Sequence, residues 1–144
     1  KLQRILSILN GDDYLREHVH YFVDYDEDLA YGISAGANAS LNLPIVGLEA
    51  CGTSWMKDII NLDLLISTHD GGVADGAIGS YLNVGGANEE EELDMLYQRI
   101  EEAIQIWDND FELEYTIQNQ LKTYLPIISG TRMLNDYLDF LFPV

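Results

Sequence analysis

The chain is poor in basic residues. It has 7 Lys and Arg against 25 Asp and Glu, which gives a formal net charge of −18 over 144 residues. A surface this negative repels the phosphates of nucleic acids and the headgroups of anionic lipids. We therefore expect no sequence-specific nucleic-acid binding and no electrostatic attachment to a membrane.

Cysteine and long apolar runs are also scarce. Cys51 is the single cysteine, which excludes an internal disulfide and a metal site built from several thiolates. No apolar run reaches the roughly 18 residues that a membrane-spanning helix needs. Residues 1–10 are too short and too amphipathic for a signal peptide. These features favour a soluble, unexported protein of a reducing compartment.

What the chain does contain is enough apolar material for a core. Hydrophobic residues make up 47% of it and charged residues 22%. This length is typical of one domain. We therefore expect a single domain over residues 1–144.

The apolar periodicity predicts helices at two places. Residues 2–9 are amphipathic, and Asn10-Gly11 is a typical helix stop. Asn88 with Glu91 forms a capping-box pattern ahead of an apolar stripe that continues to Trp107. The segment 88–107 is therefore expected to be the dominant helix.

Strands are expected between and after these helices. The segments 45–51 and 58–68 indicate two neighbouring strands joined as a hairpin, and residues 127–128 and 137–142 indicate short closing strands. Segments 30–43 and 69–87 are rich in small residues and are expected to be mobile loops. The fold class is then α+β, with a small mixed or antiparallel sheet under the dominant helix.

Motifs for metal or cofactor binding are incomplete. Asp24, Asp26 and Asp28 alternate as in a calcium loop, but Leu29 and Ala35 stand where that loop needs glycine and glutamate. His18 and His20 lack further zinc ligands nearby. We expect no metal site and no cofactor.

The sequence also lacks a catalytic signature. Cys51 is the one candidate nucleophile, but its acidic surroundings do not favour a thiolate, and a buried strand cysteine is the preferred interpretation. No combination of nucleophile, base and orienting residue can be assembled from spacing. The expectation is therefore a protein that is not an enzyme.

Two groups of residues are candidates for binding other proteins. Aromatic and apolar residues in and near the loops are candidate interface anchors, namely Trp55, Tyr81, Leu82 and Val84. Carboxylates form two candidate acidic patches, namely Asp24, Asp26 and Asp28 and then Glu89, Glu90, Glu91 and Glu92.

The order of expected elements resembles that of a known family. The matching stretches are Leu43-Pro44-Ile45-Val46, the expected strand around residues 58–66 and the helix around residues 96–104. This order, together with length and acidity, resembles the neck proteins of tailed bacteriophages, that is, the tail terminator and head-to-tail joining family. The glycine-rich loop and the segment after Trp107 are both longer than the pattern of that family requires.

The resemblance implies a structural virion protein assembled in the host cytoplasm. Its subunits would form a homo-oligomeric ring, usually a hexamer, that contacts connector, neck or tail-tube proteins. An acidic lumen would then let DNA pass without binding. The alternative is an acidic DNA mimic, in which the carboxylate patches occupy the basic groove of a nucleic-acid-binding protein.

Overall fold

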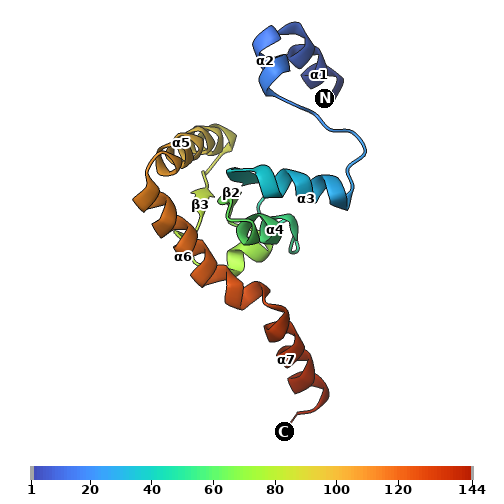
Figure 1. Ribbon diagram of the computed structural model, residues 1–144, viewed down its shortest axis with the longest axis vertical. Helices are drawn as coiled ribbons and strands as arrows, with labels where there is room; N and C mark the ends of the chain where they lie inside the picture. Colours follow the sequence, from blue (N-terminus) through green and yellow to red (C-terminus); the bar gives the residue numbers. More distant parts are fainter. Residues whose placement is uncertain (1, 144) are drawn as a thin grey trace. The chain divides into compact units, whose positions relative to one another are not determined.

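The computed structural model describes residues 2–143. The contacts between residues divide the chain into two units, whereas the sequence predicts a single domain. Unit 1 comprises residues 1–30 and unit 2 comprises residues 31–144. Figure 1 shows the helices and strands of each unit. No helix in the described part of the chain is long and apolar enough to cross a membrane.

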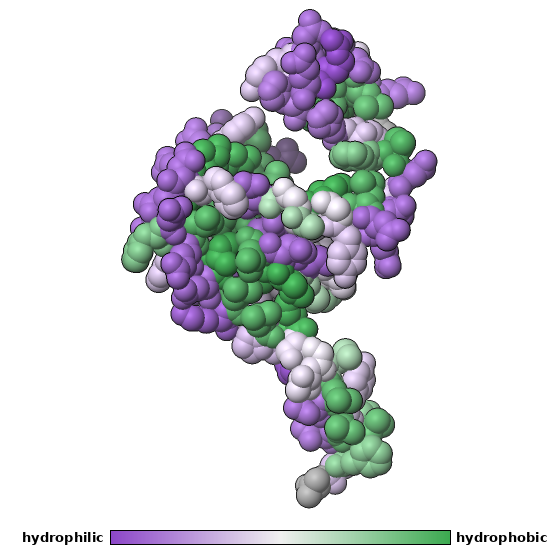
Figure 2. Space-filling view, viewed as in Figure 1, coloured by the Kyte–Doolittle hydropathy of each residue, from purple (hydrophilic) through white to green (hydrophobic). Residues whose placement is uncertain are grey.

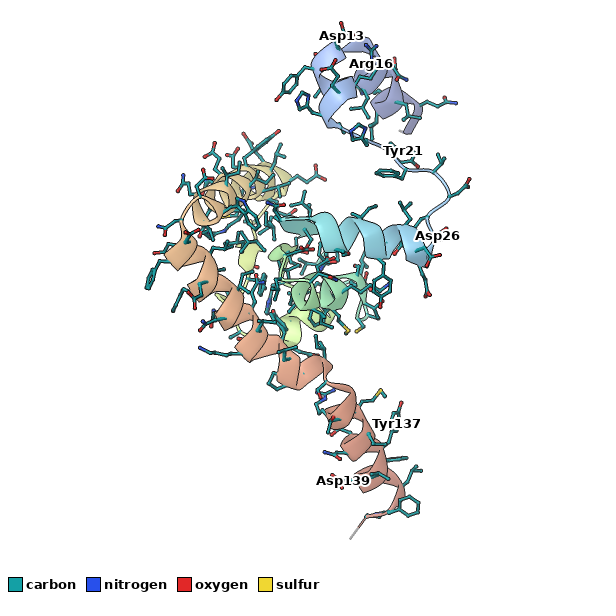
Figure 3. All side chains as sticks on the ribbon, in the orientation of Figure 1. Asp13, Arg16, Tyr21, Asp26, Tyr137 and Asp139 are labelled. Atoms are coloured by element: carbon teal, nitrogen blue, oxygen red, sulfur yellow. The ribbon has the colours of Figure 1, made fainter. Side chains whose placement is uncertain are left out.

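Unit 1 is built from short helices. α1 (Leu2–Gly11) confirms the expected first helix, and α2 (Asp13–His18) begins at Asp12, whose carboxylate accepts a hydrogen bond from the Leu15 amide. Asp13 and Arg16 form an exposed ion pair on α2 (Figure 3). α3 (Glu27–Gly36) starts in this unit and ends in unit 2. Residues 19–25, which alternate as a strand would, contain no strand.

Unit 2 contains a three-stranded parallel sheet in the order β1 (Ala39–Asn42), β2 (Leu64–Thr68) and β3 (Leu82–Val84). Ala39 pairs with Leu64, and Ile66 pairs with Leu82. α4 (Ser54–Ile60) connects the first two strands, and the 3-10 helix η1 (Gly71–Asp75) lies between the second and third. The α+β class is confirmed, but the strands are parallel rather than mixed or antiparallel.

Three helices complete unit 2. They are α5 (Glu89–Trp107), α6 (Asp110–Ile128) and α7 (Gly130–Leu141). α5 confirms the expected dominant helix and its cap, because the Asn88 side chain accepts hydrogen bonds from the amides of Glu90 and Glu91. The closing strands expected at 127–128 and 137–142 are wrong, since both segments are helical. Pro126 lies in the last turn of α6, where the hydrogen bond that it removes does not stop the helix.

The core of unit 2 lies on both faces of the sheet. On one face, Leu65 packs with Trp55 and Ile59 of α4 and with Tyr124 of α6. On the other face, Leu64 and Ile66 pack against α5, including Ala103. All five residues of β2 are buried, as is typical of a parallel strand covered by helices on both sides.

The strand predictions are only partly confirmed. The predicted strand 58–68 contains all of β2, but its first residues form the end of α4 and a turn at Leu62, whose φ is +71°. Residues 45–51 contain no strand, and the supposed loops 30–43 and 69–87 contain the end of α3, β1, η1 and β3. β1 and β3 have only four and three residues, which is too short for a clear alternation of apolar and polar residues.

Gln120 of α6 joins the helix to the sheet. Its side chain is 1% exposed; Oε1 accepts a hydrogen bond from the Leu65 amide at 3.0 Å, and Nε2 donates to the Asp63 carbonyl at 2.9 Å. It thereby satisfies the Leu65 amide of β2 and the carbonyl of Asp63, which directly precedes β2, whereas the pairing with β3 begins only at Ile66.

Replacing Gln120 by leucine is expected to lower the free energy of unfolding by about 2–4 kcal/mol, because two buried backbone groups lose their partners. Gln118→Leu is the matched control, since Gln118 is exposed on the same helix and surface changes rarely exceed about 0.5 kcal/mol. Urea denaturation of both variants measures the difference. Equal losses would show that Gln120 is dispensable.

Candidate functional site at the carboxyl edge of the sheet

Two loops lie side by side at the carboxyl edge of the sheet. Residues 43–53 follow β1, and residues 69–76 follow β2. In parallel α/β sheets the loops after the strands are the usual place for ligands, because the carboxyl ends of neighbouring strands meet there. We take these two loops as the candidate site.

Asp70 clamps the first loop to the second. Its Oδ2 atom accepts hydrogen bonds from the backbone amides of Gly47 at 2.9 Å and Glu49 at 3.0 Å. Hydrogen bonds from backbone amides, of which that of Glu49 contributes most, hold the pKa of the Asp70 carboxyl below its usual value. The carboxylate is thus kept charged in the position where it orders the loop.

Backbone contacts reinforce this clamp. The Gly72 amide donates to the Cys51 carbonyl at 2.7 Å, and the Thr68 hydroxyl donates to the Pro44 carbonyl at 2.7 Å. Gly71 has a φ of +56°, and a Cβ atom there would lie 2.6 Å from the Cys51 carbonyl oxygen. A side chain at residue 71 would therefore push the loops apart.

Tyr81 links the second loop to β3. His69 Nδ1 lies 2.7 Å from the Tyr81 hydroxyl oxygen, and that hydroxyl donates to Asn83 Oδ1 at 3.2 Å. Burial, with a smaller effect from Tyr124, raises the pKa of Tyr81 to about 12. The phenol therefore stays protonated at neutral pH and fixes the His69 ring at the edge of the site.

A cavity opens beside these loops. It has a volume of about 410 Å³ and an apolar wall that includes Leu43, Ile45, Val46 and Val84, while Glu89 and Glu92 of α5 contribute carboxylates. Ile45 is 73% exposed in the isolated chain. An apolar cavity with a few polar groups beside it is the usual form of a small-molecule site.

The structure places the candidate interface anchors in the core rather than on the surface. Trp55, Tyr81, Leu82 and Val84 are between 1% and 6% exposed. Trp55 and Tyr81 pack with Tyr124, and Leu82 and Val84 belong to β3. In the isolated chain these residues stabilise unit 2.

The acidic candidates are exposed except for Glu92, which is half-buried, and several of them have local structural roles. Asp26 accepts a hydrogen bond from the Leu29 amide at the start of α3, where Figure 3 labels it. Glu91 accepts one from the Ala87 amide at the start of α5, and Glu89, Glu90 and Glu92 share that first turn. Asp24 and Asp28 are also exposed. Carboxylates at these positions stabilise the helix starts.

The candidate metal ligands do not come together, and Cys51 lies in a loop. Between residues 2 and 143, no group of three or more His, Cys, Asp and Glu is arranged to hold a metal ion. His18 stacks on Tyr14 and contacts its carbonyl. Cys51, interpreted as a buried strand cysteine, is instead exposed in the first loop. The strand prediction was wrong there because β1 ends at Asn42.

Sequence reasoning missed Asp70 and His69 because the glycines around them indicate only a loop. A usable signal exists: both residues come directly after the run 64–68, whose first three residues are apolar. Recognising that run as a buried parallel strand would have placed them at a carboxyl edge.

Asp70→Ala is expected to release the first loop, because Gly47 and Glu49 lose a shared acceptor. Their amides should then exchange hydrogen faster, while amides in β2 keep their protection. In the unaltered chain the clamp should weaken only when the pH falls below the ordinary range of a carboxyl, towards the lowered pKa of Asp70. Asp94→Ala, on α5, is the control.

The chain is similar to curated carbohydrate phosphorylases. It is 29% identical over 157 aligned positions to a glycogen phosphorylase of Aquifex aeolicus, covering 96% of this chain and 22% of that enzyme. It is 28% identical to a glycogen phosphorylase of Mycobacterium tuberculosis and 29% identical to a maltodextrin phosphorylase of Thermococcus litoralis. These matches cover 87% and 86% of this chain and 16% of each enzyme.

The chain therefore spans about a fifth or less of the length of these relatives. No family model matches it, and no solved structure gives a significant match.

Proposed function

We propose that this chain is a segment of an α-glucan phosphorylase, an enzyme that cleaves sugar units from a glucan with inorganic phosphate. The observation that carries the proposal is the similarity to glycogen and maltodextrin phosphorylases along 86–96% of the chain. The proposal differs from the expectation of a protein without enzymatic activity, because the sequence motifs alone gave no sign of a glucan enzyme.

The unpaired edge of β1 supports the proposal that this chain is part of a larger protein. Among residues 2–143, β1 pairs with β2 alone. Beside β1, a cavity of about 330 Å³ is lined largely by apolar residues, including Leu41, Ile104 and Trp107, which are 42–58% exposed. A free strand edge next to exposed apolar side chains is the place where a further element of a larger fold would pack.

The exposed hydrophobic surface of unit 2 also supports the proposal of a larger protein. Figure 2 shows hydrophobic side chains over the middle of the unit and along one side of α7. On α7, Tyr137 is 59% exposed and points to a different side of the helix from Asp139 (Figure 3). Exposed apolar area on this scale is unusual for a chain that works alone.

In this proposal the carboxyl-edge loops form one wall of the reaction site. The clamp between Asp70 and the first loop holds Gly47 and Glu49 in place, and His69 is fixed through Tyr81. Such groups, held before the ligand arrives, orient a ligand at little entropic cost. The rest of the enzyme would supply the facing wall.

The test is an assay of the longest polypeptide encoded in frame with this chain. It is mixed with maltodextrin and inorganic phosphate, and sugar phosphate is measured. Phosphate-dependent release that Asp70→Ala reduces would support the proposal. A polypeptide that is folded by circular dichroism and releases no sugar phosphate would overturn it.

The neck-protein and DNA-mimic hypotheses stay predictions. Light scattering across salt concentrations separates them from each other: a neck protein forms rings of about six subunits, whereas a mimic stays small and binds a basic partner less tightly as salt screens the pair. Replacing Glu89, Glu90, Glu91 and Glu92 by glutamine should weaken only the mimic.

A further inference from the structure

A groove lies at the amino edge of the sheet in unit 2. It has a volume of about 470 Å³. Ala37 lies just before β1, Asn61 and Leu62 lie between α4 and β2, and α5 and α6 supply the other lining residues. Because the strands are parallel, the positions before them lie at the edge opposite to the carboxyl-edge loops. This amino-edge groove is therefore separate from the candidate site.

Most of the amino-edge groove is apolar. Its lining includes Leu62, Trp107, Leu113 and Ile117. Leu62 is 51% exposed, and Trp107, which also lines the cavity beside β1, is 42% exposed. The φ of Leu62 is +71°, so this exposed leucine is held in a backbone conformation that favours glycine. Exposed apolar residues gathered in a groove are typical of a surface that another molecule covers.

Two carboxylates form the charged side of the amino-edge groove. They are Asp110 and Glu114, and no Lys or Arg lines the groove within the part of the chain that the structure describes. Both lie on α6, where four residues correspond to roughly 6 Å along the helix axis. Gln118 Nε2 donates to Glu114 Oε1 at 2.9 Å, and Lys122 Nζ donates to Gln118 Oε1 at 3.3 Å. The neutral amide orients Glu114 without removing its charge.

The charge of the groove limits what can cover it. A second copy of this chain also carries −18 and would be repelled. Covering Asp110 and Glu114 without partners for their charges is costly, so the covering molecule must bring cations beside an apolar surface. An amphipathic helix whose apolar side is flanked by Lys or Arg one turn apart meets both requirements, because its charges match the spacing of the two carboxylates.

We propose that the amino-edge groove binds a basic amphipathic helix of a partner protein. The apolar side of that helix packs on Leu62 and Trp107, and its Lys or Arg side chains pair with Asp110 and Glu114. The acidic surface of the chain speeds the encounter, and the apolar contacts keep the complex together. The inference does not depend on the proposed phosphorylase function.

The test uses a fluorescently labelled helical peptide of leucine and lysine, with the lysines along one side of the helix. Fluorescence anisotropy should show binding to this chain that weakens as salt is added. Trp107→Ala should weaken binding by about tenfold, because the groove loses its aromatic anchor. Far-UV circular dichroism checks that this variant stays folded. A peptide of the same pattern with glutamate in place of lysine should not bind.

A matched pair of double variants separates the groove from the overall charge. Asp110→Asn with Glu114→Gln removes two carboxylates from the groove and should weaken binding by about fivefold, the usual size of two exposed ion pairs. Asp94→Asn with Glu101→Gln removes two carboxylates from exposed positions of α5 outside the groove. That control should change binding by less than about twofold, because salt screens distant charges.

Several results would overturn the inference. The first two are no binding and binding that is unchanged by Trp107→Ala. Equal losses in the two double variants would show attraction by net charge alone. Binding by this chain that disappears in the longest polypeptide encoded in frame with it would show that another part of that polypeptide covers the groove. Peptide binding by a polypeptide without phosphorylase activity keeps this inference and removes only the proposed function.

Discussion

Replacing Trp55 by alanine is expected to lower the free energy of unfolding of unit 2 by about 3–5 kcal/mol. Trp55 is 1% exposed and packs edge-on against Tyr124, with 5.2 Å between ring centroids. Its Nε1 atom also donates to the Gly52 carbonyl at 3.0 Å. The variant therefore loses the largest side chain of the core and a hydrogen bond that holds the first loop.

The chain offers a matched control in its other tryptophan. Trp107 is 42% exposed at the end of α5, and Trp107→Ala should cost about 1 kcal/mol or less. Urea denaturation followed by far-UV circular dichroism compares both variants without relying on tryptophan fluorescence. Equal losses would show that the core around α4 and α6 is not packed as described.

The second large effect concerns Asp63, the residue directly before β2. The residue is 1% exposed, and neither carboxylate oxygen has a hydrogen-bond partner within residues 2–143. Burial, and then the charge of Asp58, raise the pKa of this carboxyl from 3.8 to about 6. The folded chain therefore prefers the protonated form of Asp63.

This preference makes stability depend on pH. Between pH 3.8 and about 6 the folded state binds more protons than the unfolded state, so stability falls as pH rises through this window. The contribution of Asp63 is a loss of about 3 kcal/mol, complete above pH 6 and absent below pH 3.8. Replacement by asparagine removes that dependence.

Asp63→Asn should therefore gain about 2 kcal/mol relative to the unaltered chain when both are moved from about pH 4 to about pH 7, because a small part of the loss is already present at pH 4. The two pH values are compared because the buried asparagine amide itself lowers the free energy of unfolding, by the same amount at both pH values. Asp94→Asn, on the exposed face of α5, is the control. A difference that stays constant with pH would show that Asp63 is hydrated or paired.

The parts of the fold that the sequence predicts are those with local signals. The capping pattern at Asn88 and Glu91 and the stop at Asn10-Gly11 depend only on neighbouring residues, and both helices are confirmed. Of the expected strands, the segment 58–68 contains β2, whereas the segments 45–51, 127–128 and 137–142 contain no strand. Leu64, Leu65 and Ile66 are all buried, so no alternation marks the strand.

The candidate site shows the same limit. Asp70 is recognisable as part of a site only once its contacts with Gly47 and Glu49, more than 20 residues earlier, are known. Gly71 and Gly72 predict a loop, but the close approach of Cys51 that requires them is a tertiary contact. Spacing within one segment cannot show such pairings between segments.

The most direct test of the account is phosphorolysis by the longest polypeptide encoded in frame with this chain. With maltodextrin and inorganic phosphate, we expect sugar phosphate release that requires phosphate and falls in the Asp70→Ala variant. A folded polypeptide that releases no sugar phosphate, or whose activity is unchanged by Asp70→Ala, would contradict the account.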